Sequence, residues 1–268
     1  MLKDITLGQF FPGKSPIHKL DPRTKLLGLI GYIVALFTAK GWVAYGLVLA
    51  FLIFVVALSR ISLKAILHGL KPVVFIVTFT GILNLFLTGG EHVLVQLWGL
   101  KITLEGLKQA IFMASRILML IVGTFLMTYT TSPIALTDAL EALLHPLTYV
   151  RFPVHELSMM MCIALRFIPT LIEETDKIIA AQKARGADFE TGSLLHRAKA
   201  LVPVLVPLFI SAFRRADELA VAMECRCYQG GSGRTKLKVL RFAGRDYLAF
   251  AAMAALIAGT ILLKVFGI

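Results

Sequence analysis

The chain has 268 residues, of which 57% are hydrophobic, and its mean hydropathy is +0.80. Soluble domains are usually about half apolar or less, so this composition indicates a protein that lipid covers in part. Lys and Arg number 28 against 16 Asp and Glu, which gives a net charge of +12. A nucleic-acid-binding protein carries such charge on a soluble core, so a hydrophobic and basic chain instead favours a membrane protein with charged loops at an anionic lipid surface.

Five apolar runs are candidate membrane spans, at residues 26–39, 41–59, 72–88, 109–129 and 247–263. Each is near or below the ~20 residues that cross the hydrocarbon core of a bilayer. The fourth run contains Arg116 close to one end, where a long side chain can reach the interface. We therefore expect residues 1–130 to form an N-terminal membrane domain of about four spans, and residues 247–268 to form a C-terminal transmembrane helix.

Lysine and arginine concentrate on the cytoplasmic side of membrane proteins and so predict the orientation. With the N-terminus inside, the inside segments are 1–25, 59–71 and 131–246, and they hold 23 of these residues. The outside segments hold four, which are Lys40, Lys101, Lys108 and Lys264. Without the long segment 131–246, the inside segments still hold eight lysines and arginines, against four in the outside segments. We expect a multi-pass membrane protein with a cytoplasmic N-terminus and an outside C-terminus.

Residues 131–246 are too charged to be membrane spans and too hydrophobic for a loop, and they predict a cytoplasmic domain of three helices. The first begins at Ser132, which is placed to cap it, with Pro133 at the first helical position, and it runs to about Leu144. The second spans about 154–186 and the third about 193–228. The fold class expected from the whole chain is therefore an all-α membrane protein with about five transmembrane helices and this three-helix domain.

The second and third of these helices carry long hydrophobic stripes. Apolar positions recur at steps of three and four, a period of 3.5 that is typical of amphipathic helices packed along each other at a shallow angle. Pro169, Pro203 and Pro207 predict bends or breaks in these helices. Because the first halves are apolar nearly all round, we expect both helices to begin against the membrane spans and to end at the cytoplasmic surface.

The two long helices end on the same pattern, an arginine between small residues. The first ends on Ala184-Arg185-Gly186 and the second on Cys225-Arg226-Cys227. Small neighbours leave a guanidinium unshielded, so that it can insert its donors and positive charge into a partner's pocket. A solvated arginine in the last turn of a helix is the alternative for either one alone. The repetition at both helix ends favours a docking role.

Several ordered motifs give the chain a family resemblance. They are the segment at 15–25 (SPIHKLDPRTK), Thr130-Thr131-Ser132-Pro133, the segment at 164–170 (ALRFIPT), Ala184-Arg185-Gly186, and Ala222-Met223-Glu224 leading into Arg226 and Tyr228. On these residues the chain resembles the T component of energy-coupling factor transporters, the group that includes the membrane partners of cobalt, biotin and other vitamin uptake systems.

The resemblance implies a non-catalytic scaffold that couples ATP hydrolysis to movement of a substrate-binding membrane subunit. Its expected partners are two ABC ATPase subunits on the cytoplasmic side, a small substrate-binding membrane subunit and membrane lipid, with no nucleic acid. Arg185 and Arg226 are the docking residues by this resemblance, and Ala184, Gly186, Cys225 and Cys227 flank them. The family's second motif usually reads Ala-Arg-Gly, so Cys227 replaces a glycine that would allow a backbone bend after the arginine.

We expect four further charged residues to support the coupling helices, namely Arg166, Glu173, Arg215 and Glu224. Glu173 and Lys177 lie four residues apart, which is the spacing of a surface ion pair on a helix. We expect no catalytic residues, cofactor or metal site, since the histidines are scattered and no cysteine pair has metal-ligand spacing. The expected location is a bacterial cell membrane, with ATPase activity in the partner subunits.

Two other classes of function stay open from the sequence. A membrane-embedded enzyme acting on a lipid needs ionisable residues at depth, and the five predicted spans contain only Arg116. A stand-alone secondary transporter tends to show repeated membrane halves, whereas the repeat found here lies within residues 131–246. Lipid turnover by the purified chain would favour the first class, and substrate uptake without an ATPase would favour the second.

Overall fold

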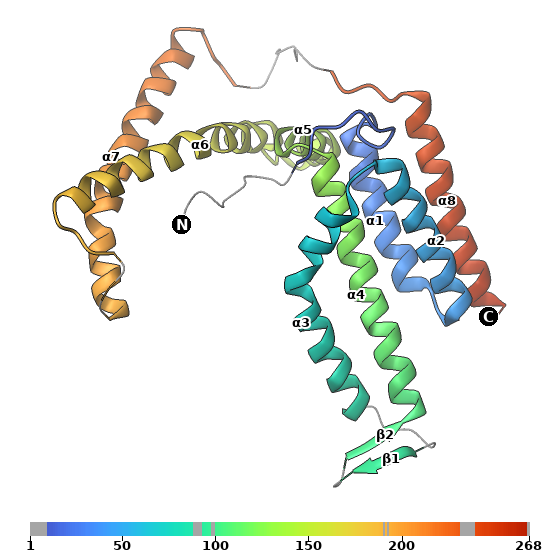
Figure 1. The fold of residues 1–268 in the computed structure, drawn as a ribbon. Helices are drawn as coiled ribbons and strands as arrows, with labels where there is room; N and C mark the ends of the chain where they lie inside the picture. Colours follow the sequence, from blue (N-terminus) through green and yellow to red (C-terminus); the bar gives the residue numbers. More distant parts are fainter. Residues whose placement is uncertain are drawn as a thin grey trace. The chain divides into compact units, whose positions relative to one another are not determined.

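The computed structural model describes residues 10–87, 93–97, 100–189, 191, 193–230 and 239–266. Contacts between residues divide the chain into two compact units. The first, called here the bundle unit, comprises Gly8–Ala139 and Leu240–Ile268. The second, called the coupling-helix unit, contains Leu140–Val239. Each unit is described separately below (Figure 1).

The bundle unit consists of α1 (Pro22–Thr38), α2 (Gly41–Ser59), α3 (Leu63–Leu87), α4 (Leu104–Thr130) and α8 (Gly244–Val265). Helices α1, α2, α4 and α8 lie side by side, and α3 packs on α4 (Figure 1). The core forms where α1, α2 and α4 meet, and Leu36, Val48 and Leu126 are buried there. Gly123 of α4 admits the Tyr32 ring, because a Cβ at this glycine would lie 2.7 Å from a ring carbon.

Five described helices are long and apolar enough to cross a membrane, which confirms the predicted all-α membrane class. Four of them, α2, α3, α4 and α8, correspond to predicted spans. The first predicted span is only the 17-residue helix α1, which is too short to be among the five. The fifth is instead α6 (Val154–Ala184), whose apolar first half makes it hydrophobic enough although its second half is charged.

An antiparallel hairpin of β1 (Val93–Leu97) and β2 (Leu100–Thr103) lies between α3 and α4, where the sequence analysis predicted no regular structure. Val95 pairs with Ile102 and Leu97 with Leu100, with an irregularity between Val93 and Val95. Strands this short give a weak periodic signal beside the long apolar runs around them. Thr103 ends the hairpin and caps α4, since its Oγ1 accepts a hydrogen bond of 3.1 Å from the Gly106 amide.

The coupling-helix unit contains the end of α5 (Pro133–Leu144), a 3₁₀ turn at His145–Val150, α6, and α7 (Leu194–Glu224). The predicted start of α5 is confirmed, because the Ala135 amide donates to Ser132 Oγ at 3.3 Å. Glu141 joins α5 to α6 by accepting from Ser158 Oγ at 3.0 Å and by lying 3.1 Å from His155 Nδ1. The sequence analysis predicted a bend or a break at each proline of the long helices. No break occurs, because α6 continues through Pro169 and α7 continues through Pro203 and Pro207.

Candidate coupling site

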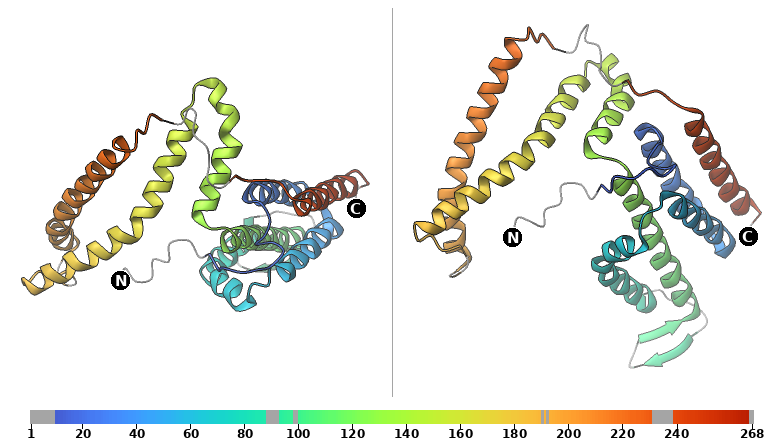
Figure 2. Two further views of the ribbon diagram at one scale, coloured as in Figure 1. Left: turned by 90° about the horizontal axis from the view of Figure 1, so that it is seen from above. Right: turned by 45° about the horizontal axis from the view of Figure 1, so that its top comes forward.

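Helices α6 and α7 run antiparallel where they contact each other (Figure 2). Near the end of α6, Gln182 Nε2 donates a hydrogen bond of 3.2 Å to the Pro203 carbonyl near the start of α7. That carbonyl would bond the amide of residue 207 in a regular helix, but Pro207 has no N–H. Gln182 therefore supplies the donor that the proline removes, which explains how α7 continues through this proline.

A second set of hydrogen bonds joins the two helices about two helical turns away from Gln182. The carboxylate of Glu174 on α6 accepts from Ser211 Oγ and, at 3.1 Å, from Arg215 Nη2 on α7. Both side chains of the ion pair are partly buried. Of the predicted supporting residues, Arg215 thus lies at the helix contact, whereas Glu173, Arg166 and Glu224 are exposed. The sequence analysis placed Glu173 among the supporting residues, but its neighbour Glu174 faces α7.

The two arginine motifs have the same backbone geometry. After Arg185, the Gly186 amide donates to the Lys183 carbonyl and the Ala187 amide to the Gln182 carbonyl, both at 3.0 Å. After Arg226, the Cys227 amide donates to the Glu224 carbonyl at 2.8 Å and the Tyr228 amide to the Met223 carbonyl at 3.1 Å. These paired bonds define the Schellman motif, in which the arginine is the C-cap residue and the next residue is left-handed.

Cys227 makes the bend that the family's glycine would provide. Its φ is +55°, and the φ of Gly186 at the matching position is +88°. A non-glycine residue in this region costs ~1–2 kcal/mol, because its Cβ crowds the following carbonyl oxygen. The replacement of glycine by cysteine therefore keeps the shape of the helix end and weakens its stability. Arg185, Arg226 and the small residues that flank them are all exposed.

Cys227→Gly is expected to stabilise the end of α7 by about 1 kcal/mol, because glycine adopts positive φ without strain. Amide hydrogen exchange measured by mass spectrometry should then be about fivefold slower at residues 226–228. Cys225→Gly is the matched control: Cys225 continues the helix, its amide donating to the Val221 carbonyl at 2.9 Å, so glycine there should speed exchange. Equal rates in the wild type and Cys227→Gly would contradict the strain argument.

The two arginines lie at ends that point away from each other. From the contact of Glu174 with Ser211, Arg185 lies ~16 Å farther along α6 and Arg226 ~22 Å farther along α7. Because the helices run antiparallel, these two distances extend in opposite senses. The arrangement presents two arginines with the same local geometry at separate places on the helix pair.

In the bundle unit, the residues around the start of α1 form a junction that the sequence analysis did not predict. The structure shows that the Asp21 amide donates to Asp246 Oδ1 of α8 at 2.9 Å, and that Arg23 pairs with Asp21 at 3.0 Å. Arg23 also lies over the Phe242 ring, 4.1 Å from its centroid. No local pattern marks Asp246, because its partner is 225 residues away in sequence.

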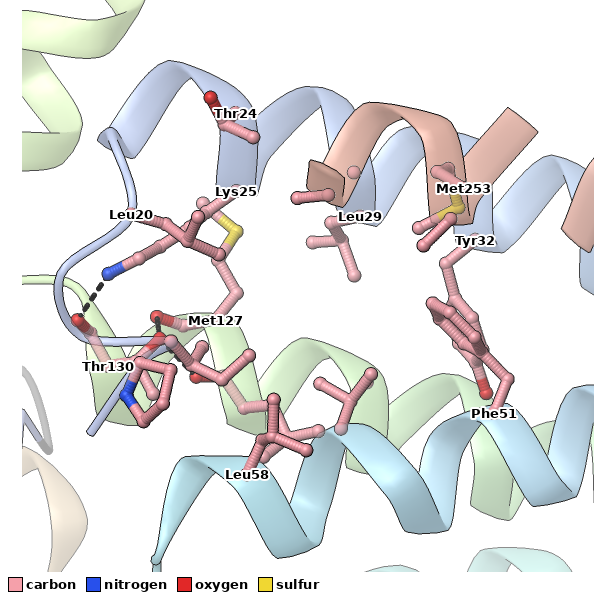
Figure 3. Close-up of a pocket in the computed structure, with 18 of the residues that line it drawn as sticks. Leu20, Thr24, Lys25, Leu29, Tyr32, Phe51, Leu58, Met127, Thr130 and Met253 are labelled. Carbon is pink, nitrogen blue, oxygen red and sulfur yellow. Dashed lines mark hydrogen bonds between the residues drawn. The ribbon is translucent and has the colours of Figure 1, made fainter. Parts of the chain in front are cut away.

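Lys25 extends this junction to α4 at the edge of an apolar cavity of about 480 Å³ between α1, α2, α4 and α8 (Figure 3). Its Nζ donates to the Thr130 carbonyl at 2.8 Å and to the His18 carbonyl at 3.4 Å. The segment at 15–25 and the threonines at 130–131, which carry the family resemblance, thus meet in space. Their shared role is to hold the ends of α1, α4 and α8 together.

Comparison with known proteins places the chain in a family. The family model described as CbiQ, cobalt transport protein, matches residues 13–237. Over 261 residues the chain is 55% identical to the energy-coupling factor transporter transmembrane protein EcfT of Thermosediminibacter oceani, covering 97% of this chain and 98% of that one. Identity to the EcfT proteins of Clostridium kluyveri and Bacillus subtilis is 52% and 47%, over 99% and 96% of this chain and 98% and 97% of theirs.

These matches confirm the predicted resemblance over nearly the full chain. They also confirm that the chain is a multi-pass transmembrane component of a bacterial transporter and not an enzyme, which removes the lipid-modifying alternative. The chain belongs to the CbiQ cobalt transport protein family, the transmembrane T components of energy-coupling factor transporters.

Proposed function

We propose that this chain couples two ABC ATPases to a small substrate-binding membrane subunit that imports a vitamin or a metal ion. Arg185 at the end of α6 docks into one ATPase and Arg226 at the end of α7 into the other. Residues 131–246 act as the cytoplasmic coupling domain, between the membrane domain at 1–130 and the last transmembrane helix at 247–268. The N-terminus is cytoplasmic and the C-terminus is outside.

The observation that carries the proposal is the pair of matching helix ends. Two exposed arginines occupy the same position of two Schellman motifs, on helices that contact each other. An arginine that enters a protein pocket forms several charge-assisted hydrogen bonds, and such residues often dominate the energy of an interface. Two motifs of one geometry suit two ATPase subunits that present the same kind of groove.

The contact between α6 and α7 supports a mechanical role. Glu174 joins the two helices through Ser211 and Arg215, and Gln182 joins them again toward the end of α6. A force applied to either arginine would therefore move both helices together rather than bend one of them. This is what coupling requires, because motion of two ATPases must reach one membrane subunit.

The exposed apolar side of α7 supports a second contact in the same complex. Phe209 and Phe213 have 61% and 69% of their surface exposed, among other large apolar side chains of this helix. Contiguous apolar surface of this kind marks a protein or membrane interaction site. The substrate-binding membrane subunit, which is itself hydrophobic, suits this side of α7.

The test is co-purification of the tagged chain from mild detergent, followed by mass spectrometry. The proposal expects two ABC ATPase subunits, or one ATPase as a pair, together with a small hydrophobic protein. Recovery of the chain alone, with the ATPases shown to be expressed, would contradict it. Substrate uptake into vesicles that contain the chain without any ATPase would instead establish the alternative of a stand-alone secondary transporter.

A further inference from the structure

A second cavity of about 250 Å³ lies in the bundle unit where the α1–α2 turn meets α4. Lys40 of the turn and Arg116 of α4 both line it, together with Tyr45, Gln109 and Phe112. Among the described residues that line this cavity, none is acidic. The cavity thus gathers two cations and an amide and supplies no carboxylate to balance them.

Arg116 is the residue that needs an explanation. It lies within a helix that is long and apolar enough to cross a membrane, where a cation is costly unless it is paired or hydrated. Its Nε donates a hydrogen bond of 2.8 Å to Tyr45 Oη, and its guanidinium carbon lies 5.4 Å from the Phe37 ring centroid and 5.7 Å from that of Tyr45. These contacts hold the guanidinium in place but leave its charge without an anion among the residues that the structure describes.

The position of the cavity suits the headgroup level of a bilayer. It lies at the turn where α1 ends and α2 begins, and the turn carries Lys40. Trp42 next to the turn is 58% exposed and packs against Phe112 with the two rings tilted and their centroids 4.6 Å apart. Exposed tryptophan is enriched at membrane–water interfaces. A cation beside such a residue is within reach of lipid phosphates.

We infer that the cavity formed by Lys40, Gln109 and Arg116 binds a phosphate group, which serves as the counter-ion of Arg116. Phosphate matches these donors because its several oxygens accept from the paired N–H groups of a guanidinium and from an ammonium at once. The cavity is too small for a helix of a partner protein, which is ~10–12 Å across. The phosphate comes either from a phospholipid headgroup or from free phosphate, and the two sources can be separated by experiment.

The experiment uses the purified full-length chain, stripped of lipid in detergent and examined by native mass spectrometry. It is offered phosphatidylglycerol, or a glycosyl diacylglycerol with the same acyl chains and no phosphate. We expect phosphatidylglycerol to be retained about tenfold more strongly than the glycolipid. If inorganic phosphate added in excess displaces it, the site takes free phosphate; if not, the site takes the lipid headgroup.

Lys40→Gln should lower this preference several-fold, and Lys40→Gln with Arg116→Gln should remove it. Lys40 is exposed, so its single substitution keeps the test valid even if the double variant folds poorly. Lys264→Gln is the matched control, because Lys264 is an exposed cation in the last turn of α8 that does not line the cavity. Retention of both lipids to the same degree, or an unchanged preference in Lys40→Gln and in the double variant, would overturn the inference.

Discussion

Replacing Arg185 and Arg226 together with alanine is expected to abolish ATP-driven uptake and to leave the chain folded in the membrane. Both side chains are exposed, and both backbone motifs close through main-chain hydrogen bonds that alanine retains. The loss therefore concerns docking and not the helix ends themselves. Truncation of an interface arginine at a docking hot spot costs ~2–4 kcal/mol, so the pair should weaken ATPase association by at least about a hundredfold.

Two measurements separate docking from folding. Co-purification of the ATPases with the tagged chain should fail in the double variant, while its yield and thermal unfolding in detergent should equal those of the wild type. Lys177→Ala with Arg214→Ala is the matched control, because it removes two exposed cations from the same two helices, at positions that precede Arg185 by 8 residues and Arg226 by 12 residues. Normal ATPase recovery by Arg185→Ala with Arg226→Ala would rule out the proposed docking role.

Conversion of both arginines to lysine distinguishes charge from geometry. Lysine keeps the positive charge but replaces the five-donor planar guanidinium by a single ammonium. If bidentate contacts in a groove hold the ATPases, the lysine variant should recover only part of the uptake that alanine removes. Full uptake by the lysine variant would mean that charge alone is recognised.

The largest loss of stability is expected from Asp246→Ala. Asp246 is 2% exposed, and its carboxylate accepts from the Asp21 amide at 2.9 Å and from the Ala243 amide at 2.7 Å. One side chain thus caps the starts of both α1 and α8. Alanine would leave the buried Asp21 amide without an acceptor, at a cost of ~1–3 kcal/mol, and would remove the cap of α8, at a cost of ~1 kcal/mol, so a loss of about 2–4 kcal/mol is expected.

The measurement is the free energy of unfolding of the purified chain in detergent, determined by denaturant titration. Asp246→Asn keeps the shape and one strong acceptor, so it should lose about half as much stability as alanine. Asp217→Ala, which removes an exposed carboxylate on α7, serves as the control and should change stability by less than about 0.5 kcal/mol. A loss below about 1 kcal/mol in Asp246→Ala would show that other groups satisfy the two amides.

The sequence by itself determined the features that depend on neighbouring residues. Apolar periodicity predicted α6 and α7, and the spacing of Ser132 and Pro133 predicted the start of α5. The matching arginine motifs were visible without a structure, because a helix end is built by hydrogen bonds that reach only three to five residues back. The membrane class and the family also followed from the sequence, and the comparisons confirmed both.

Features that depend on long-range contacts were not predictable in the same way. Glu173 and Glu174 are adjacent and chemically alike, and only the rotation of α6 against α7 decides that Glu174 meets Arg215. The charged half of α6 led the sequence analysis to exclude this helix from the spans, whereas length and mean hydropathy include it. The hairpin of β1 and β2 was missed because its strands are too short for a periodic signal.

The tertiary structure alone decided how the functional residues are arranged. The antiparallel contact of α6 and α7 sends Arg185 and Arg226 in opposite directions, although their sequence patterns are nearly the same. The hydrogen bond from the Asp21 amide to the Asp246 carboxylate joins two residues that are 225 positions apart in the sequence. Sequence periodicity shows which face of a helix is apolar, but the partner of each polar group is chosen by packing in three dimensions, because a buried carboxylate must find its donors wherever the fold brings them.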